Sequence, residues 1–520
     1  MINIVRLILT WIRRLPWKFT IPFLVILAAW LFLVSFTFQK FQVSELAGLL
    51  AKLVGIQLPG KQEITGFAYY KILIRVFFES VVTLIILFLA FLTSYNMAAL
   101  IYRLIRRHPP GKPYVHPPTL PEPGSGDVFE RFRERNGIKD LRIGLILAGG
   151  GAKGAYQAGA MKGIHEFLEK NNVLDKVRMV AGTSIGSWNS LFWLAGLVKS
   201  PKGSPMSVHE AWWGHISVDR IMEFAAYFPL KRNYFLTTRP WQETFDDIFQ
   251  KEKAIKDAID RLFTPEGNNP PMHFYLTRSN VELGILEFAT NNTALVDMKR
   301  LNWKSKIEEP VIPSDQYELI DSTTANPLDR LKIAVFASMD LPPLFPYMHI
   351  RTDREEWFED GGVVDNLPMR FGTEIEECNL LFVLPLNASF AEQVSHDSVM
   401  KRLFRVMDIR QGVLEHNSIK LARLYNDKIR LKNQINKQEH HAGNTEKKPL
   451  LSVFAICPEQ PLVINTAEFW KPKEALEAFD LMYSAARTAL NDSFLELSDP
   501  DCLMMTLVGP QGQTTILDDF

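Results

Sequence analysis

The chain has 520 residues, enough for a large catalytic domain with additional segments. It carries 58 basic and 58 acidic residues and no nucleic-acid-binding motif, so neither charge nor sequence favours a nucleic-acid partner. The three cysteines, Cys378, Cys457 and Cys502, are widely spaced and form neither a disulfide framework nor a zinc-binding pattern. We therefore expect no metal site and no nucleic-acid partner.

Two apolar stretches near the N-terminus are each long enough to cross a membrane. Residues 19–38 contain no charge, and residues 77–101 contain only Glu79. Because about 20 helical residues span the hydrocarbon layer, residues 1–107 are predicted to form a membrane anchor with two transmembrane helices. Basic residues are denser outside these stretches than between them, which favours a multi-pass protein of the inner (cytoplasmic) membrane whose following domain faces the cytoplasm.

The segment after the anchor changes composition abruptly. Residues 108–126 contain seven prolines and are predicted to form an extended linker. Beyond it, apolar runs at 141–148 and 177–181 each precede a helix-forming segment, ending near Lys170 and Leu197. This alternation is typical of βαβ units and predicts an α/β fold, a three-layer sandwich with a central, mostly parallel sheet between helices.

The rest of the chain continues this pattern less regularly. We expect a hairpin at 273–292, strands at 380–386 and 451–457, and helices at about 399–436 and 467–497. The aromatic-rich stretch 212–241 is either a lid over an acyl-chain cleft or ordinary core. These elements suggest a catalytic domain at 127–390 and a C-terminal helical extension at 391–520 packed on it.

A serine lies where the second predicted strand meets a helix. The turn has the form Gly-x-Ser-x-Gly, with Gly182 and Gly186 on either side of Ser184. Such a nucleophile elbow reverses the chain sharply and exposes the serine hydroxyl at the start of the helix, where the helix dipole favours developing negative charge. An ordinary strand–helix turn is the alternative for so short a motif.

The first predicted strand runs into a glycine-rich loop. Its residues are Gly149, Gly150, Gly151, Ala152, Lys153 and Gly154. Glycines let backbone amides approach a substrate and donate to the oxyanion of a tetrahedral intermediate, as acyl transfer requires. The same glycine spacing also matches a dinucleotide-binding fingerprint, but that fold needs an acidic residue at the end of the second strand, where this chain has Ser184.

The base that would activate the serine is less obvious. None of the eleven histidines lies in a distinctive setting. Asp360, in the sequence Asp360-Gly361-Gly362, could accept the serine proton if the fold brings it within hydrogen-bonding distance, although this motif in isolation favours an ordinary hairpin turn.

Taken in order, these motifs resemble the patatin-like phospholipase family, here in a bacterial, membrane-anchored form. The glycine loop, the Ser184 turn and Asp360-Gly361-Gly362 match its ordered signature, and the segments 337–346 and 365–368 are also similar. The resemblance implies a patatin-like fold and a Ser-Asp dyad of Ser184 and Asp360. It also implies an oxyanion hole formed by the glycine loop, chiefly by the amides of Gly150, Gly151 and Ala152.

The resemblance also implies an activity. It predicts hydrolysis of the acyl ester of membrane phospholipids or lysophospholipids, with the lipid bilayer as partner and without a cofactor. Two alternatives are an acyl hydrolase of neutral lipids or thioesters and a catalytically silent, membrane-anchored protein that binds a lipid or a partner. The sequence does not indicate an oligomeric state.

Overall fold

The structure is a computed structural model. It describes residues 20–29, 85–102, 127–201, 204, 206–225, 234, 236–264, 272–301, 306–341, 344–350, 356–387, 399–439, 447–459, 464, 466, 468–501, 504–509 and 512–518. The chain divides into two compact units. One comprises Met1–Pro109 with Met222–Thr237, and the other comprises Pro110–Ile221 with Thr238–Phe520.

The smaller unit contains the predicted membrane anchor. Its helix Ile85–Tyr102 is long and apolar enough to cross a membrane, whereas the described helix Thr20–Ala29 is shorter. The remaining residues of the predicted spans, 19, 30–38 and 77–84, lie outside the described residues. A two-stranded ribbon, β3 (Glu223–Phe224) and β4 (Leu236–Thr237), also belongs to this unit, and Phe224 packs in one apolar cluster with Tyr95 and Tyr102.

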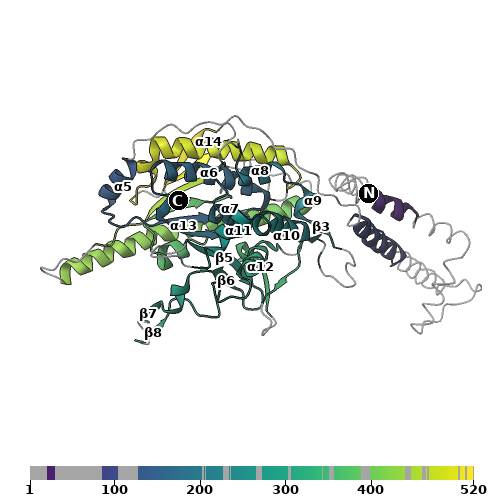
Figure 1. Cartoon of the computed structure of the whole chain (residues 1–520), viewed down its shortest axis with the longest axis horizontal. Helices are drawn as coiled ribbons and strands as arrows, with labels where there is room; N and C mark the ends of the chain where they lie inside the picture. Colours follow the sequence, from purple (N-terminus) through teal and green to yellow (C-terminus); the bar gives the residue numbers. More distant parts are fainter. Residues whose placement is uncertain are drawn as a thin grey trace, which may run out of the picture. The chain divides into compact units, whose positions relative to one another are not determined.

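The larger unit alternates strands and helices (Figure 1). Its helices are α5 (Val128–Asn136), α6 (Gly154–Lys170), α7 (Ile185–Leu194), α8 (Val208–Gly214), α9 (Val218–Ile221), α10 (Arg239–Phe245), α11 (Lys253–Asp260), α12 (Pro327–Met339), α13 (Val399–Glu439) and α14 (Pro472–Leu497). Single turns include η1 (Gly151–Lys153), η3 (Asp246–Gln250), η5 (Gly361–Val363) and η6 (Phe371–Ile375).

One large sheet runs through this unit. Its strands are β1 (Ile143–Leu147), β2 (Val177–Gly182), β5 (His273–Asn280), β6 (Ile285–Thr290), β9 (Tyr317–Leu319), β10 (Met348–His349), β11 (Trp357–Asp360), β12 (Leu380–Leu384), β13 (Ser452–Pro458), β14 (Met504–Val508) and β15 (Thr514–Asp518). The order is β10-β11-β5-β2-β1-β12-β13-β14-β15, with β6 on β5 and β9 on β6. A short separate ribbon pairs β7 (Lys299–Leu301) with β8 (Glu308–Pro310).

The centre of the sheet is parallel, as predicted. From β5 through β2, β1, β12 and β13 to β14, each neighbouring pair is parallel, and β10, β11, β6 and β15 add antiparallel strands outside this centre. Every residue of β1 and β12 is buried, which explains why these strands appear in the sequence as continuous apolar runs. The predicted mixed α/β fold with a mostly parallel sheet is confirmed.

Helices cover both faces of this sheet. On one face, Ile419 and Ala422 of α13 lie in the same apolar cluster as Met179 and Leu381 of the strands. On the other face, Phe494 of α14 contacts the rings of Phe382 and Phe454, with ring centroids 6.4 Å apart in both pairs. Helix α14 lies along α6 (Figure 1). Burial between these layers supplies the main core of the unit.

The sheet continues past the predicted boundary at residue 390. Strand β12 pairs in parallel with β13, and β13 with β14, so residues after 390 contribute three strands to the same sheet as well as two helices. The segment predicted as a helical extension thus contains strands as well as helices, and the strand predicted at 451–457 corresponds to β13. A parallel neighbour for β12 requires a long crossover connection, and α13 lies in that connection.

Gly159 allows α6 and α14 to approach closely. A methyl group at residue 159 would lie 2.0 Å from the backbone oxygen of Phe479, whereas one at Gly163 would meet Ala486 at 3.2 Å. We expect Gly159→Ala to destabilise the protein by about 1–3 kcal/mol through overpacking. Gly163→Ala is the matched control on the same helix and should change stability less. Chemical denaturation of both variants tests this, and equal stabilities would contradict it.

Candidate active site

Ser184 lies at the turn between β2 and α7, where the sequence predicted a nucleophile elbow. Its backbone has φ 53° and ψ −123°, a strained conformation for a residue with a side chain. The flanking glycines permit the turn, because a methyl group at Gly182 would lie 2.5 Å from the Gly186 oxygen and one at Gly186 2.3 Å from the Leu147 oxygen. Ser184 is the N-cap residue of α7 and is 8% exposed.

Asp360 reaches the same place from the other side of β5. Strand β5 pairs with β2 through Leu276 and Gly182, and with β11 through Arg278 and Asp360. These registers bring the last residue of β11 to the edge of the sheet where β2 ends. The Ser184 hydroxyl lies within hydrogen-bonding range of the Asp360 carboxylate. Two residues far apart in the sequence therefore lie together in the fold.

The surroundings of Asp360 make its carboxylate more basic. Asp360 is 2% exposed, and this burial raises its pKa from the ordinary value of 3.8 to about 7. Hydrogen bonds from the Ser184 hydroxyl and the Gly362 amide oppose this rise, and the Gly362 amide donates to Oδ1 of Asp360 at 2.8 Å. Gly361 and Gly362 begin the turn η5, so the sequence Asp-Gly-Gly here ends a strand and holds the carboxylate.

The end of α12 supports both residues, a role that the sequence did not reveal. Ser338 Oγ accepts a hydrogen bond from the Ser184 amide at 2.9 Å, and the Asp340 backbone oxygen accepts one from the Asp360 amide at 3.1 Å. Both residues belong to the segment 337–346 that resembles the family. This resemblance was the only feature of the sequence that pointed to their supporting role. The Asp340 carboxyl is itself buried, and burial together with the nearby charge of Asp360 raises its pKa well above the usual range.

The glycine loop lies against Ser184, and most of its amides are already occupied. A methyl group at Gly149 would lie 2.9 Å from Cβ of Ser184. The amide of Gly149 donates to Asn366 at 3.4 Å, Ala152 to Thr466 at 2.8 Å and Lys153 to Gly150 at 3.3 Å. The Gly154 amide donates to backbone oxygens of the same turn. Among the described residues, the amides of Gly150 and Gly151 have no protein acceptor, which narrows the predicted set of oxyanion donors.

The described histidines have other partners. His209 is buried beside Asn189 at 2.9 Å, and burial lowers its pKa to about 3. His165 packs against Trp193, and His273 lies 2.6 Å from Glu376. Within the described part of the chain, no hydrogen bond joins a histidine to Ser184 or Asp360. Among the described titratable groups, Asp360 is therefore the one positioned to accept a proton from Ser184.

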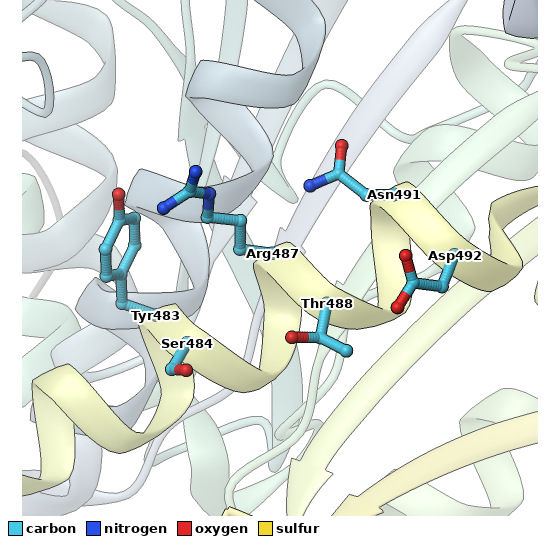
Figure 2. Close-up of a pocket in the computed structure, with 6 residues that line it drawn as sticks. All are labelled: Tyr483, Ser484, Arg487, Thr488, Asn491 and Asp492. Carbon is cyan, nitrogen blue, oxygen red and sulfur yellow. The ribbon is translucent and has the colours of Figure 1, made fainter. Parts of the chain in front are cut away.

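Two tryptophans of the aromatic-rich stretch lie in the core. Trp212 and Trp241 are buried, and their rings pack on Trp188 of α7 with centroids 5.1 Å and 5.3 Å away. The core alternative therefore applies to these two residues. A separate pocket lies along α14 and is lined by polar side chains (Figure 2). Neither Ser184 nor Asp360 lines it, so it is distinct from the site described above.

The fold and the site together define an α/β protein with a buried serine–aspartate pair beside a glycine loop. Residues 145–371 match the family model of the patatin-like phospholipases. The chain therefore contains a patatin-like phospholipase domain, and this family suggests lipid acyl hydrolase activity. The matched segment ends within η6, before β12, so α13 and the last strands of the sheet lie outside it.

Other comparisons add less. A search of curated proteins finds no match. Among solved structures, the chain is similar to VipD from Legionella pneumophila, with 12% sequence identity and a TM-score of 0.30. That similarity covers 68% of this chain and 67% of the VipD chain.

Proposed function

We propose that this protein is a membrane-anchored serine acyl hydrolase that cleaves the acyl esters of membrane phospholipids or lysophospholipids. The observation that carries this proposal is the position of the Ser184 hydroxyl within hydrogen-bonding range of Asp360, beside two loop amides that have no acceptor among the described residues. A nucleophile, a base and oxyanion donors are the groups that acyl transfer requires. Membership of residues 145–371 in the patatin-like phospholipases supports a lipid substrate.

The proposed reaction has two halves. In the first, Asp360 takes the proton of Ser184 while Oγ attacks the ester carbonyl, and the amides of Gly150 and Gly151 donate to the resulting oxyanion. Collapse of this intermediate expels the alcohol, which receives the proton from Asp360, and leaves an acyl-enzyme. In the second half, Asp360 deprotonates a water that attacks the acyl-enzyme, and Ser184 recovers its proton as the fatty acid leaves.

The loop geometry makes Gly151 a sensitive test of the oxyanion hole. Gly151 has φ 58°, and a methyl group there would lie 2.2 Å from the Thr466 oxygen. We expect Gly151→Ala to displace the loop and lower kcat by about 10²–10³-fold, the usual cost of losing one oxyanion donor. Gly137 also has a positive φ, 62°, with open space around it, so Gly137→Ala is the matched control. Comparable kcat values for the two variants would contradict the assignment.

The membrane anchor fits a bilayer-embedded substrate. We infer that residues 19–38 and 77–101 form two spans, with both termini and the catalytic unit in the cytoplasm. The uncharged first stretch, the apolar helix Ile85–Tyr102 and the flanking basic residues support this topology. A cysteine substituted for Lys61 should react with a membrane-impermeant reagent added outside intact cells. If this cysteine does not react, the opposite orientation is indicated.

The activity itself is tested with the full chain in phospholipid nanodiscs. Lipid mass spectrometry should detect free fatty acid and the matching lysophospholipid or glycerophosphodiester, and a fluorophosphonate probe should label Ser184. Products from triacylglycerol or acyl thioesters alone would favour the alternative hydrolase. A chain that is neither labelled nor active would favour the catalytically silent binding protein.

A further inference from the structure

Helix α13 presents three polar side chains to the interior where it passes the glycine loop. Asp408, Gln411 and Glu415 are spaced by three and four residues, which places them on one face of the helix. Gln411 is 8% exposed and Glu415 1% exposed. Further along α13, the buried face becomes apolar at Ile419 and Ala422, which join the sheet core. Buried polar groups are unfavourable unless they are paired, so their contacts here require an explanation.

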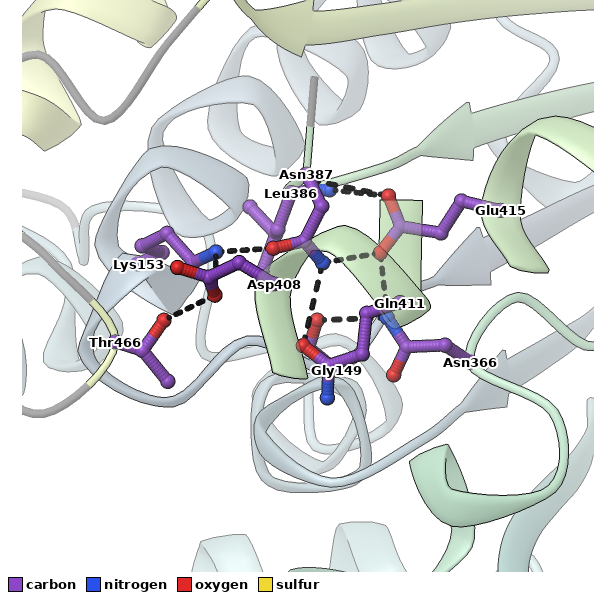
Figure 3. Close-up of polar contacts among 9 residues, drawn as sticks. All are labelled: Gly149, Lys153, Asn366, Leu386, Asn387, Asp408, Gln411, Glu415 and Thr466. Carbon is purple, nitrogen blue, oxygen red and sulfur yellow. Dashed lines mark hydrogen bonds and ion pairs between the residues drawn. The ribbon is translucent and has the colours of Figure 1, made fainter. Parts of the chain in front are cut away.

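Asp408 holds the end of the glycine loop. The Lys153 side chain is 1% exposed, and its Nζ lies 3.1 Å from Oδ1 of Asp408 (Figure 3). The same Nζ also donates to Oδ1 of Asn387. Oδ1 of Asp408 in turn accepts from the Thr466 hydroxyl at 2.9 Å, and the Thr466 backbone oxygen accepts from the Ala152 amide at 2.8 Å. Lys153 and Ala152 are therefore both fixed through contacts that meet at Asp408.

Glu415 holds the start of the same loop. Its Oε2 accepts from the amides of Leu386 at 3.1 Å and Asn387 at 3.0 Å. Its Oε1 accepts from the side-chain amides of Asn387, at 2.5 Å, and Asn366 (Figure 3). The Asn366 Nδ2 also donates to the Gly149 backbone oxygen at 3.1 Å. All four contacts of Glu415 use N–H donors, which favour the ionised carboxylate, whereas burial opposes them and raises the pKa of Glu415 to about 7.

We propose that Asp408 and Glu415 are positioning residues for the reaction. Glu415 acts through Asn366 on Gly149, and Asp408 acts through Lys153, so the two carboxylates hold the loop on both sides of Gly150 and Gly151. Fixing both ends aims the amides of Gly150 and Gly151 at the reacting carbonyl. Helix α13 lies outside the matched family segment 145–371, so the domain match alone omits this part of the active centre. The inference rests on the proposed function.

The test compares charge-removing variants of α13 in the full chain. Asp408→Asn and Glu415→Gln are prepared in phospholipid nanodiscs, and kcat is divided by the number of active sites that a fluorophosphonate probe labels at completion. We expect kcat per labelled site to fall by roughly 10- to 100-fold at nearly unchanged KM, because small displacements of catalytic groups cost rates of this size. Asp427→Asn, an exposed acid on the same helix, is the matched control and should retain wild-type kcat.

A double variant separates positioning from general structural support. If Asp408 acts through Lys153, then Lys153→Met combined with Asp408→Asn should lose no more activity than the more damaging single variant. The proposal would be overturned if the loss of kcat in the double variant equalled the product of the losses in the two single variants. It would also be overturned if Asp408→Asn and Glu415→Gln both kept kcat per labelled site within twofold of wild type. If Glu415→Gln fails to fold, Asp408→Asn decides alone, because Asp408 is 16% exposed and less embedded. A wild-type chain without labelling or hydrolysis would instead refute the proposed function.

Discussion

Replacement of Ser184 by alanine is expected to abolish ester hydrolysis and fluorophosphonate labelling together. Loss of a serine nucleophile typically lowers kcat by about 10⁴-fold or more. The hydroxyl lies at the N-terminus of α7, within hydrogen-bonding range of Asp360, and no other described serine combines these features. The fold should survive, because alanine can keep the backbone hydrogen bond from residue 184 to Ser338. Free fatty acid release and thermal unfolding measure both effects.

A second serine on the same helix provides the control. The Ser190 hydroxyl is buried and donates to the Ser187 backbone oxygen at 2.7 Å, so it serves the helix rather than the site. Ser190→Ala should therefore keep activity and labelling. Residual hydrolysis in Ser184→Ala at more than a few per cent of wild type would place the nucleophile elsewhere. Equal loss in both variants would indicate a general folding defect.

Replacement of Asp360 by asparagine is expected to lower kcat by about 10⁴-fold, the upper range for a general base, because an amide cannot accept the serine proton. The wild-type protein should also show a pH dependence. Burial raises the pKa of Asp360 to about 7, so kcat/KM should fall with decreasing pH below about 7 as the base becomes protonated. Glu359→Gln, at the preceding residue of β11, should keep activity and move this fall to slightly lower pH, because the charge of Glu359 contributes to the raised pKa of Asp360. A wild-type profile that stays flat down to pH 5 would contradict the base assignment.

Asp360→Asn, which should abolish most of the activity, should at the same time increase the stability of the fold at high pH. Because the pKa of Asp360 is higher in the folded protein than its ordinary value of 3.8, folding binds a proton between about pH 4 and 7. The stabilising contribution is present at low pH and is lost as the pH rises through about 7. Asp360→Asn removes the buried charge and should be more stable than wild type at pH 8, by up to about 4 kcal/mol. The difference should vanish near pH 4, and denaturation at both values tests the sign.

This opposition between activity and stability is expected of a catalytic site. Ser184 holds a strained backbone conformation, and Asp360 and Asp340 are two buried carboxyl groups close enough to influence each other. Such arrangements lower stability and persist where the chemistry needs them. The end of α12 supports both members of the pair, through the Ser338 hydroxyl and the Asp340 backbone oxygen. Substitutions in this segment are therefore expected to affect activity even though neither residue is proposed to react.

The sequence by itself determined the features that depend on local pattern. Continuous apolar runs predicted the buried parallel strands β1, β2, β12 and β13, and the motif Gly-x-Ser-x-Gly predicted the turn at Ser184, because burial and turn geometry restrict residue types over a few positions. The ordered motifs also indicated the family. They named Asp360 as a candidate base, although nothing local distinguished it from a hairpin turn.

Only the tertiary structure decided which groups meet. The registers of β5 with β2 and β11 bring Asp360 to Ser184, and the Thr466 oxygen occupies the Ala152 amide, which the sequence had offered as an oxyanion donor. No local sequence pattern indicated that Asp408 contacts Lys153 of the glycine loop, that Glu415 contacts Asn366, or that β13 pairs with β12. Hydrogen bonds between residues hundreds of positions apart depend on chain packing, and no short segment of the sequence specifies their partners.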